Sequence, residues 1–189
     1  MNANGEALAP ARELMSGEQL AQALEALADR IVADFPGGQG MMVLGIRTRG
    51  AIIAKRLQQA LKARYDISIG YGTLDITLYR DDLSPLRPQP EVGESELPFD
   101  VSGATVILVD DVLYTGRTIR AALDEIVDFG RPAYVRLAVV VDRGLREYPI
   151  QPDYASMKIE TNHDQKVRVL LSEMDEQDRV VMLETADPA

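Results

Sequence analysis

Short apolar runs alternate with amphipathic stretches along this chain, and this alternation constrains its fold most. The runs "MMVLGI" (41–46), "ATVILVD" (104–110) and "AYVRLAVVVD" (133–142) have the length and apolarity of buried strands. Between them, "AIIAKRLQQALKAR" (51–64) and "RTIRAALDEIVDFG" (117–130) have helical spacing. Strand–helix–strand order predicts an α/β fold with a mostly parallel central sheet flanked by helices.

The rest of the chain predicts one further helix, three further strands and two loose ends. Ser16 followed by Gln19 has the pattern of a capping box, which predicts a helix over residues 18–35. Further apolar runs predict strands over 67–79, 166–174 and 179–183, with "RGLREYPIQPDY" (143–154) irregular. We expect residues 1–15 and 185–189 to be loose, and the whole chain of 189 residues to form one domain.

Composition excludes several classes of protein. The chain has no cysteine, which rules out disulfides, thiolate nucleophiles and cysteine-based zinc sites. It has no apolar stretch long enough to span a membrane, and its first residues lack the basic start and apolar run of a signal peptide. We therefore expect a cytoplasmic protein that does not enter membranes. The net charge of −10 disfavours nucleic acid as a partner unless a local basic patch overrides it.

The stretch "VILVDDVLYTGRT" (106–118) places an anion-binding pattern beside two acids. Asp110 and Asp111 end an apolar strand, and the next helix begins at a turn containing Gly116. Helix N-termini carry unpaired N–H groups and partial positive charge, so they bind phosphate. The turn also supplies polar side chains from Thr115, Arg117 and Thr118. This spacing suits ribose 5-phosphate, with the acids on the sugar hydroxyls or on a divalent cation; the plainer alternative is an ordinary helix cap.

A second turn, "GIRTRG" (45–50), follows another predicted strand. Arg47, Thr48, Arg49 and Gly50 would lie at the same sheet edge as the first turn, because ligands of such sheets bind beyond the strands' carboxyl ends. Arginine forks match phosphate oxygens, so a pyrophosphate would suit this turn. The alternative is a helix start with surface arginines, but cations there oppose the helix dipole unless an anion is bound.

Residues 80–103 are rich in proline, glycine and acids and lack apolar periodicity. So long a loop inside a compact domain is typical of a flexible lid, and a disordered surface insertion is the alternative.

"VILVDDVLYTGRT" resembles the phosphoribosyl-pyrophosphate motif of type I phosphoribosyltransferases. Together with "GIRTRGAIIAKRL", "LDITLYRDDL" and "LAVVVDRGLREYPIQPDY", it resembles the family of pyrimidine-operon regulatory proteins with uracil phosphoribosyltransferase activity, from about Ser16 to Glu184. The resemblance implies the type I phosphoribosyltransferase fold with a small hood. It also implies synthesis of UMP and pyrophosphate from uracil and phosphoribosyl pyrophosphate with Mg²⁺, in a homodimer or higher homo-oligomer.

The resemblance also implies residue roles. Asp110 and Asp111 would act on the ribose hydroxyls and indirectly on Mg²⁺, and Arg80 would be a catalytic lid arginine that closes on pyrophosphate. The 5-phosphate would bind the turn after Asp111, and pyrophosphate the turn that begins at Arg47. The base would lie against a hood formed by residues 141–155, with contacts from Val141, Asp142, Arg143, Tyr154 and Ala155.

Departures from the family pattern leave alternatives open. Leu145, Tyr148, Ser156 and Glu160 stand at changed hood positions, so a purine base is a possible substrate. Tyr114 favours a pyrimidine, since purine-using relatives often carry an acid there. Regulatory family members bind RNA through basic residues, and here the first helix has more acids than bases. The alternatives are a UMP- or UTP-sensing RNA-binding regulator with weak or no catalysis, or a purine-base enzyme.

Overall fold

The computed structural model describes residues 11–79 and 95–184. A central five-stranded sheet has the order β3-β2-β4-β5-β6, and every neighbouring pair is parallel. Its strands are β2 (Met41–Ile46), β3 (Gly70–Leu74), β4 (Thr105–Leu113), β5 (Tyr134–Asp142) and β6 (Tyr154–Lys158). The predicted α/β fold with a mostly parallel sheet is confirmed.

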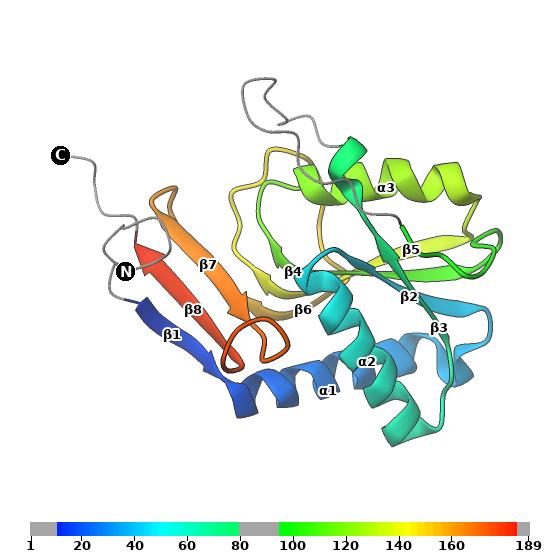
Figure 1. Cartoon of the computed structure of the whole chain (residues 1–189), viewed down its shortest axis with the longest axis horizontal. Helices are drawn as coiled ribbons and strands as arrows, with labels where there is room; N and C mark the ends of the chain where they lie inside the picture. Colours follow the sequence, from blue (N-terminus) through cyan, green and yellow to red (C-terminus); the bar gives the residue numbers. More distant parts are fainter. Residues whose placement is uncertain (1–10, 80–94, 185–189) are drawn as a thin grey trace.

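Helices cover both faces of this sheet (Figure 1). One face carries α3 (Arg117–Phe129), and the other carries α1 (Gly17–Asp34) and α2 (Arg49–Tyr65). Two short 3₁₀ turns, η1 (Pro36–Gly38) and η2 (Ile76–Tyr79), follow α1 and β3. Within the described ranges, the helices are too short or too polar to cross a membrane.

The strands supply both halves of the core because their side chains alternate between the two faces. In β4, Ile107 and Val109 pack with α1 and α2, whereas Val106 and Leu108 pack with α3. All four side chains are at most 1% exposed. Near-continuous apolar sequence in a strand is therefore required here, since neither face meets water.

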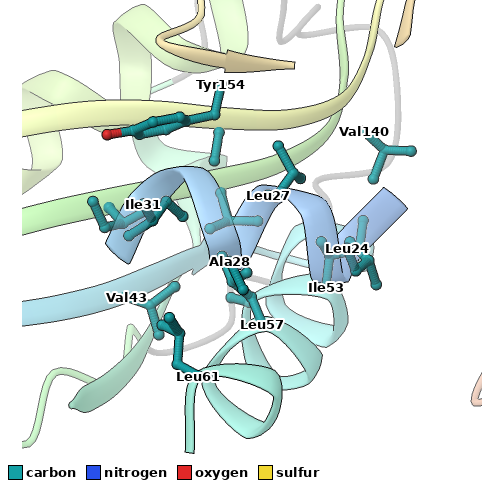
Figure 2. Packing of buried hydrophobic residues seen from close by; sticks show 14 of the residues in the cluster. Leu24, Leu27, Ala28, Ile31, Val43, Ile53, Leu57, Leu61, Val140 and Tyr154 are labelled. Carbon is teal, nitrogen blue, oxygen red and sulfur yellow. The ribbon is translucent and has the colours of Figure 1, made fainter. Parts of the chain in front are cut away.

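α1 begins as the sequence predicts. The Ser16 side chain accepts a hydrogen bond from the Gln19 N–H, and the Gln19 side chain accepts one from the Ser16 N–H. Its apolar positions Leu24, Leu27 and Ile31 point into the layer shared with α2 (Figure 2). Burying a side chain of this size stabilises the fold by roughly 1.5–3 kcal/mol.

A second, smaller sheet corrects the expectation that residues 1–15 are loose. β1 (Ala11–Ser16), β8 (Arg179–Glu184) and β7 (Gln165–Leu170) form an antiparallel sheet in the order β1-β8-β7. β1 is ordered because β8 pairs with it and Met15 is buried under α1. Residues 1–10 and 185–189 lie outside the described ranges. β7 also ends earlier than predicted, and residues 171–178 form the connection to β8.

The prediction of a flexible loop over residues 80–103 is wrong for residues 95–103. Glu96 bridges Thr73 of β3 through two backbone hydrogen bonds of 2.9 Å, and Val101 is fully buried. The Phe99 ring fills the space beside Gly70, where a Cβ would lie 2.8 Å from it. Residues 95–103 are therefore packed on the sheet. Residues 80–94, including Arg80, lie outside the described ranges, so the lid stays a prediction for that part.

The predicted hood is also placed differently. Val141 and Asp142 are the last residues of β5, and Tyr154 and Ala155 open β6, so they belong to the central sheet. The stretch predicted to be irregular ends where β6 begins, and the strand was missed because "YASMK" is short and only Tyr154 in it is fully buried. The described small sheet is built instead from β1, β7 and β8.

Candidate functional site

The two predicted turns meet at the carboxyl edge of the central sheet. β2 ends at Ile46 and leads into α2, and its neighbour β4 ends at Leu113 and leads into α3. Gly50 packs directly on the end of β4, because a Cβ there would lie 2.6 Å from the Val109 carbonyl oxygen and 3.1 Å from Asp110 Cα. Any larger residue would push α2 away from β4, so Gly50 sets how closely the two turns approach.

Asp110 and Asp111 are held in a low-dielectric environment. Asp110 is 7% exposed, and its Oδ1 accepts the Asp111 N–H at 2.9 Å. Asp111 Oδ1 accepts the Val112 N–H at 2.9 Å. Burial, with the charge of Asp111, raises the pKa of Asp110 well above its ordinary value. Burial also raises the pKa of Asp111, against the opposing charge of Arg49. Such a pair gains from a ligand that supplies hydroxyl donors or positive charge.

The start of α3 has the backbone geometry of an anion cradle, which is the role that the sequence predicts for it. Gly116 caps the helix with φ 93°, a left-handed conformation that favours glycine, and the first turn contains no acid. The loop is fixed from the other side, because the Thr115 carbonyl accepts the Glu147 and Tyr148 N–H groups at 2.9 and 3.0 Å. A Cβ on Gly116 would lie 3.2 Å from Tyr148 Cβ. Thr118 lies in the first helical turn, where N–H groups favour a bound anion.

Arg117 contributes to the cradle mainly through its backbone. Its N–H lies 3.4 Å from Thr115 Oγ1 at the helix start. Its guanidinium pairs with Glu147 at 2.6 Å and stacks on the Tyr148 ring at 5.4 Å. An anion would have to compete with Glu147 for this side chain.

The arginine-bearing turn differs, because both guanidinium groups bind acids from other segments. Arg47 donates to Thr73 Oγ1 at 3.2 Å and to Glu96 Oε1 at 2.8 Å. Arg49 donates from Nη2 to both carboxylate oxygens of Asp175 at 3.1 Å. Thr48 caps α2 without a side-chain hydrogen bond, and the Arg47–Thr48 peptide bond is cis.

At the end of β5, Asp142 and Arg143 lie close to the cradle. Asp142, 4% exposed, accepts the Gly144 N–H at 3.0 Å. Arg143, 5% exposed, stacks 4.0 Å from the centre of the Tyr114 ring and donates to Thr161 Oγ1 at 3.0 Å. Burial lowers the pKa of Arg143. Val141 is fully buried and pairs with Val112 of β4, so the end of β5 lies beside the strand end that carries Asp110 and Asp111.

Tyr154 and Ala155 are not brought to this edge, which corrects the predicted base-binding set. They pair with Ala138 and Val139 in the middle of β5, and Lys158 is the residue in register with Asp142. The Tyr154 hydroxyl donates to Asp34 at 2.7 Å, beneath α1. These positions follow from the existence of β6, which sequence reasoning missed.

Sequence reasoning gave no site role to Arg146, which connects two loops of the site. Its guanidinium donates to Asp142 Oδ1 at 2.6 Å, to the Tyr114 carbonyl at 2.8 Å and to the Ile150 carbonyl at 2.8 Å. His163 is exposed, and its Nδ1 lies 3.2 Å from the Tyr114 hydroxyl. No local pattern marks either contact, since the partners are distant in sequence.

The donors present fit a weakly held Mg²⁺ ion. No group of three or more acids and histidines suited to a metal occurs in residues 11–79 and 95–184. Mg²⁺ commonly binds through one or two carboxylates and takes its other ligands from water and substrate phosphates. Asp110 and Asp111 supply such a pair beside the anion cradle.

Comparison with known proteins identifies the family of this chain. The model of the phosphoribosyl transferase domain matches residues 10–177, so the chain belongs to that family. It is 46% identical over 175 residues to "Bifunctional protein PyrR" of Pelotomaculum thermopropionicum, covering 93% of this chain and 97% of the relative. The protein of the same name from Deinococcus radiodurans is 44% identical over 179 residues, covering 95% and 98%. The family resemblance found in the sequence is thereby confirmed.

Solved structures agree on the fold. A hypoxanthine-guanine phosphoribosyltransferase from Bacillus anthracis superimposes with a TM-score of 0.67 at 18% identity, covering 91% of this chain and 96% of the other. A hypoxanthine phosphoribosyl transferase from Trypanosoma cruzi gives 0.68 at 16% identity, covering 95% and 93%. At such identities the likeness shows the phosphoribosyltransferase fold alone.

Proposed function

We propose that this protein is a uracil phosphoribosyltransferase, which forms UMP and pyrophosphate from uracil and phosphoribosyl pyrophosphate. One observation carries the proposal: two adjacent carboxylates, the buried Asp110 and the half-buried Asp111, lie between the helix start at Gly116 and the turn ending at Gly50. The similarity to proteins named bifunctional protein PyrR supports it.

The three parts of the substrate match three parts of the site. The ribose hydroxyls donate hydrogen bonds to Asp110 and Asp111, which are rich in acceptor oxygens. The 5-phosphate binds the N–H groups at the start of α3, together with Thr115, Arg117 and Thr118. Pyrophosphate binds the turn of Arg47, Thr48, Arg49 and Gly50, where Glu96 contacts the guanidinium of Arg47 and Asp175 contacts that of Arg49.

The reaction develops opposite charges at two places in this site. Positive charge grows on the ribose as its bond to pyrophosphate breaks, and the carboxylates of Asp110 and Asp111 stabilise it. Negative charge grows on the leaving pyrophosphate, and Arg47 and Arg49 stabilise it. Bound Mg²⁺ would neutralise part of the pyrophosphate charge. We propose that Arg80, outside the described residues, adds to this group.

The base lies against the end of β5. Val141 is fully buried and supports this strand end from within the core, while Asp142, Arg143 and the Tyr114 ring provide the polar groups beside it. The loop after Asp111 offers Tyr114 where purine-using relatives often have an acid, which favours uracil over a purine. Arg146 keeps this wall and the cradle in a fixed relation, because it bonds to both loops.

An assay with radiolabelled uracil, phosphoribosyl pyrophosphate and Mg²⁺ tests the proposal, and labelled UMP is the expected product. Competition with unlabelled uracil, hypoxanthine and guanine then shows which base the enzyme accepts. Only unlabelled uracil is expected to reduce the amount of labelled UMP. If UMP does not form at high enzyme concentration, the enzymatic proposal fails; inhibition by hypoxanthine or guanine would favour a purine substrate.

A second candidate function is regulation through RNA with UMP or UTP as the signal. The near full-length similarity to proteins named bifunctional favours it. Several exposed arginines oppose it, because they already bind acids: Arg64 pairs with Asp29, Arg120 with Asp124 and Arg136 with Asp153. A homodimer or higher oligomer could still collect arginines on one face.

Gel-shift titration with the leader RNA of the chain's own operon, with and without UMP, separates the two functions. Binding that UMP strengthens would establish the regulator, and no shift at low salt would eliminate it.

A further inference from the structure

The turn between β7 and β8 docks on α2, although its sequence "LSEMDEQD" suggests only a solvated acidic loop. We call residues 171–178 the acidic turn. It binds two arginines of α2, Arg49 and Arg56, which lie on one face two helical turns apart. Figure 1 shows the acidic turn beside the helix. Through these contacts the small sheet reaches the pyrophosphate side of the candidate site.

Arg56 anchors the acidic turn. Its Nη1 and Nη2 donate to the two carboxylate oxygens of Asp178 at 2.7 and 2.9 Å, and its Nε donates to Glu173 at 2.9 Å. The guanidinium of Arg56 lowers the pKa of Asp178 to about 2. Asp178 also accepts the Ser172 N–H. Because several bonds hold this guanidinium, the position of the turn on α2 is well defined.

Asp175 is held by its own turn and directed at Arg49. Its Oδ2 accepts the N–H of the fully buried Leu171 at 2.9 Å, and its own N–H bonds back to the Leu171 carbonyl. Both carboxylate oxygens then accept from Nη2 of Arg49. The two side chains are only 25% and 22% exposed, so solvent screens this pair less than a surface pair.

This contact uses one nitrogen of Arg49 and leaves others for a ligand. A guanidinium has five N–H donors in a fixed plane, and Asp175 binds only Nη2. The buried Nε of Arg49 has no acceptor in the part of the chain that the structure describes. A buried donor without a partner is unfavourable, and an oxygen of pyrophosphate is an acceptor of the right charge.

We propose that Asp175 is a positioning residue for the pyrophosphate site: it fixes the guanidinium of Arg49 so that its remaining donors face the leaving group. The inference rests on the proposed phosphoribosyl transfer and assigns to the small sheet a part in it. Asp175 itself does not touch the substrate, so its effect passes through Arg49.

Asp175→Asn tests this role with little change in shape. The amide keeps an oxygen for the Leu171 N–H and turns its own donors toward Arg49, so the guanidinium loses its acceptor. We expect KM for phosphoribosyl pyrophosphate and Kd for inorganic pyrophosphate with Mg²⁺ to rise about tenfold. KM for uracil should be unchanged, whereas a general structural defect would change it as well.

Glu173→Gln is the matched control. It removes the same charge from the same turn, but it acts on Arg56, which keeps Asp178. Its pyrophosphate affinity should stay within about twofold of the original protein. Equal weakening in both variants would show that only the turn's net charge matters and would overturn the positioning role.

The outcomes separate this inference from the proposed function. If the unmodified protein binds pyrophosphate and forms UMP but Asp175→Asn behaves identically, the positioning role is wrong and the function stands. Tighter pyrophosphate binding in Asp175→Asn would show that Asp175 competes with the ligand, which also overturns the proposal. No binding of pyrophosphate or phosphoribosyl pyrophosphate by the unmodified protein would remove the proposed function itself.

Discussion

The turns after β4 and β2 lie side by side at one sheet edge, yet they are built in opposite ways. In the turn after β4, the acids are held by their own segment: the N–H groups of Asp111 and Val112 bond to the side chains of Asp110 and Asp111. The turn after β2 depends on distant acids, since Arg47 binds Glu96 and Arg49 binds Asp175. The acids of one turn are placed by local backbone bonds, whereas the arginines of the other are placed by tertiary partners.

This difference indicates how each turn responds to a ligand. The β4 turn has buried acids whose raised pKa values reflect unfavourable desolvation, so a ligand relieves an existing electrostatic cost. The β2 turn has positive charges already neutralised by carboxylates, so an anion must replace or share those contacts. Changes in the first turn should therefore have larger effects on binding than changes around the second.

The largest effect is expected from Asp111→Asn. Hydrogen bonds to a charged acceptor contribute about 1.5–3 kcal/mol each, so kcat/KM for phosphoribosyl pyrophosphate should fall about a hundredfold. The melting temperature should stay equal or rise, because a buried charge is removed. Steady-state kinetics with thermal unfolding measure both. Unchanged kinetics with a lower melting temperature would show that the acid is structural only.

The pH dependence should show activity and stability moving in opposite directions. Protonation of Asp110 should lower kcat/KM about tenfold per pH unit on an acid limb that begins well above the ordinary aspartate pKa of 3.8. Because the folded-state pKa of Asp110 is raised, its contribution to stability is fully present below the unfolded pKa. That contribution is lost as pH rises through the folded pKa.

Urea unfolding across this pH range, in the original protein and in Asp110→Asn, tests the stability half. In Asp110→Asn, the free energy of unfolding should not fall as the pH rises through this range. An identical pH profile in both proteins would mean that Asp110 does not titrate between the ordinary and the raised pKa.

A smaller effect is expected from Gly116→Ala in the cradle. The left-handed φ of 93° and the nearby Tyr148 both oppose a side chain, so the free energy of unfolding should fall by about 1–2 kcal/mol. KM for phosphoribosyl pyrophosphate should rise about tenfold, because the helix start must shift. Gly103→Ala is the control: its φ is 73°, with no atom within 4 Å of the added carbon. A similar rise in KM for that remote variant would exclude a local effect.

The smallest effect is expected from Glu96→Gln beside Arg47. Glu96 is 73% exposed, and exposed ion pairs contribute roughly 0–1 kcal/mol. Release of Arg47 from this carboxylate should lower KM for phosphoribosyl pyrophosphate about twofold to threefold, with little change in stability. Asp66→Asn, which breaks the exposed pair with Lys62 away from the site, serves as the reference. A higher KM in Glu96→Gln would indicate that Glu96 orients Arg47.

The sequence predicted four strands of the central sheet and missed its edge strand β6 and strand β1 of the small sheet. Continuous apolar runs such as 104–110 are typical of strands buried on both faces, so the parallel sheet and the edge where Asp110 meets Gly50 could be predicted. β1 and β6 were missed because each forms a strand by pairing with a distant one: β1 is stabilised by β8, and β6 by β5. The misplacement of Tyr154 follows directly from the missing β6.

By itself, then, the sequence determined the apolar strands, the capped start of α1 and the acids and glycine of the turn after β4, because each depends on neighbours within a few residues. Only the tertiary structure decided that Arg49 meets Asp175, that Arg146 joins two loops and that Tyr154 faces α1 rather than the site edge. These contacts join residues far apart in the chain. Which charged and hydrogen-bonding groups meet at that separation depends on how the layers pack, and no local sequence pattern predicts it.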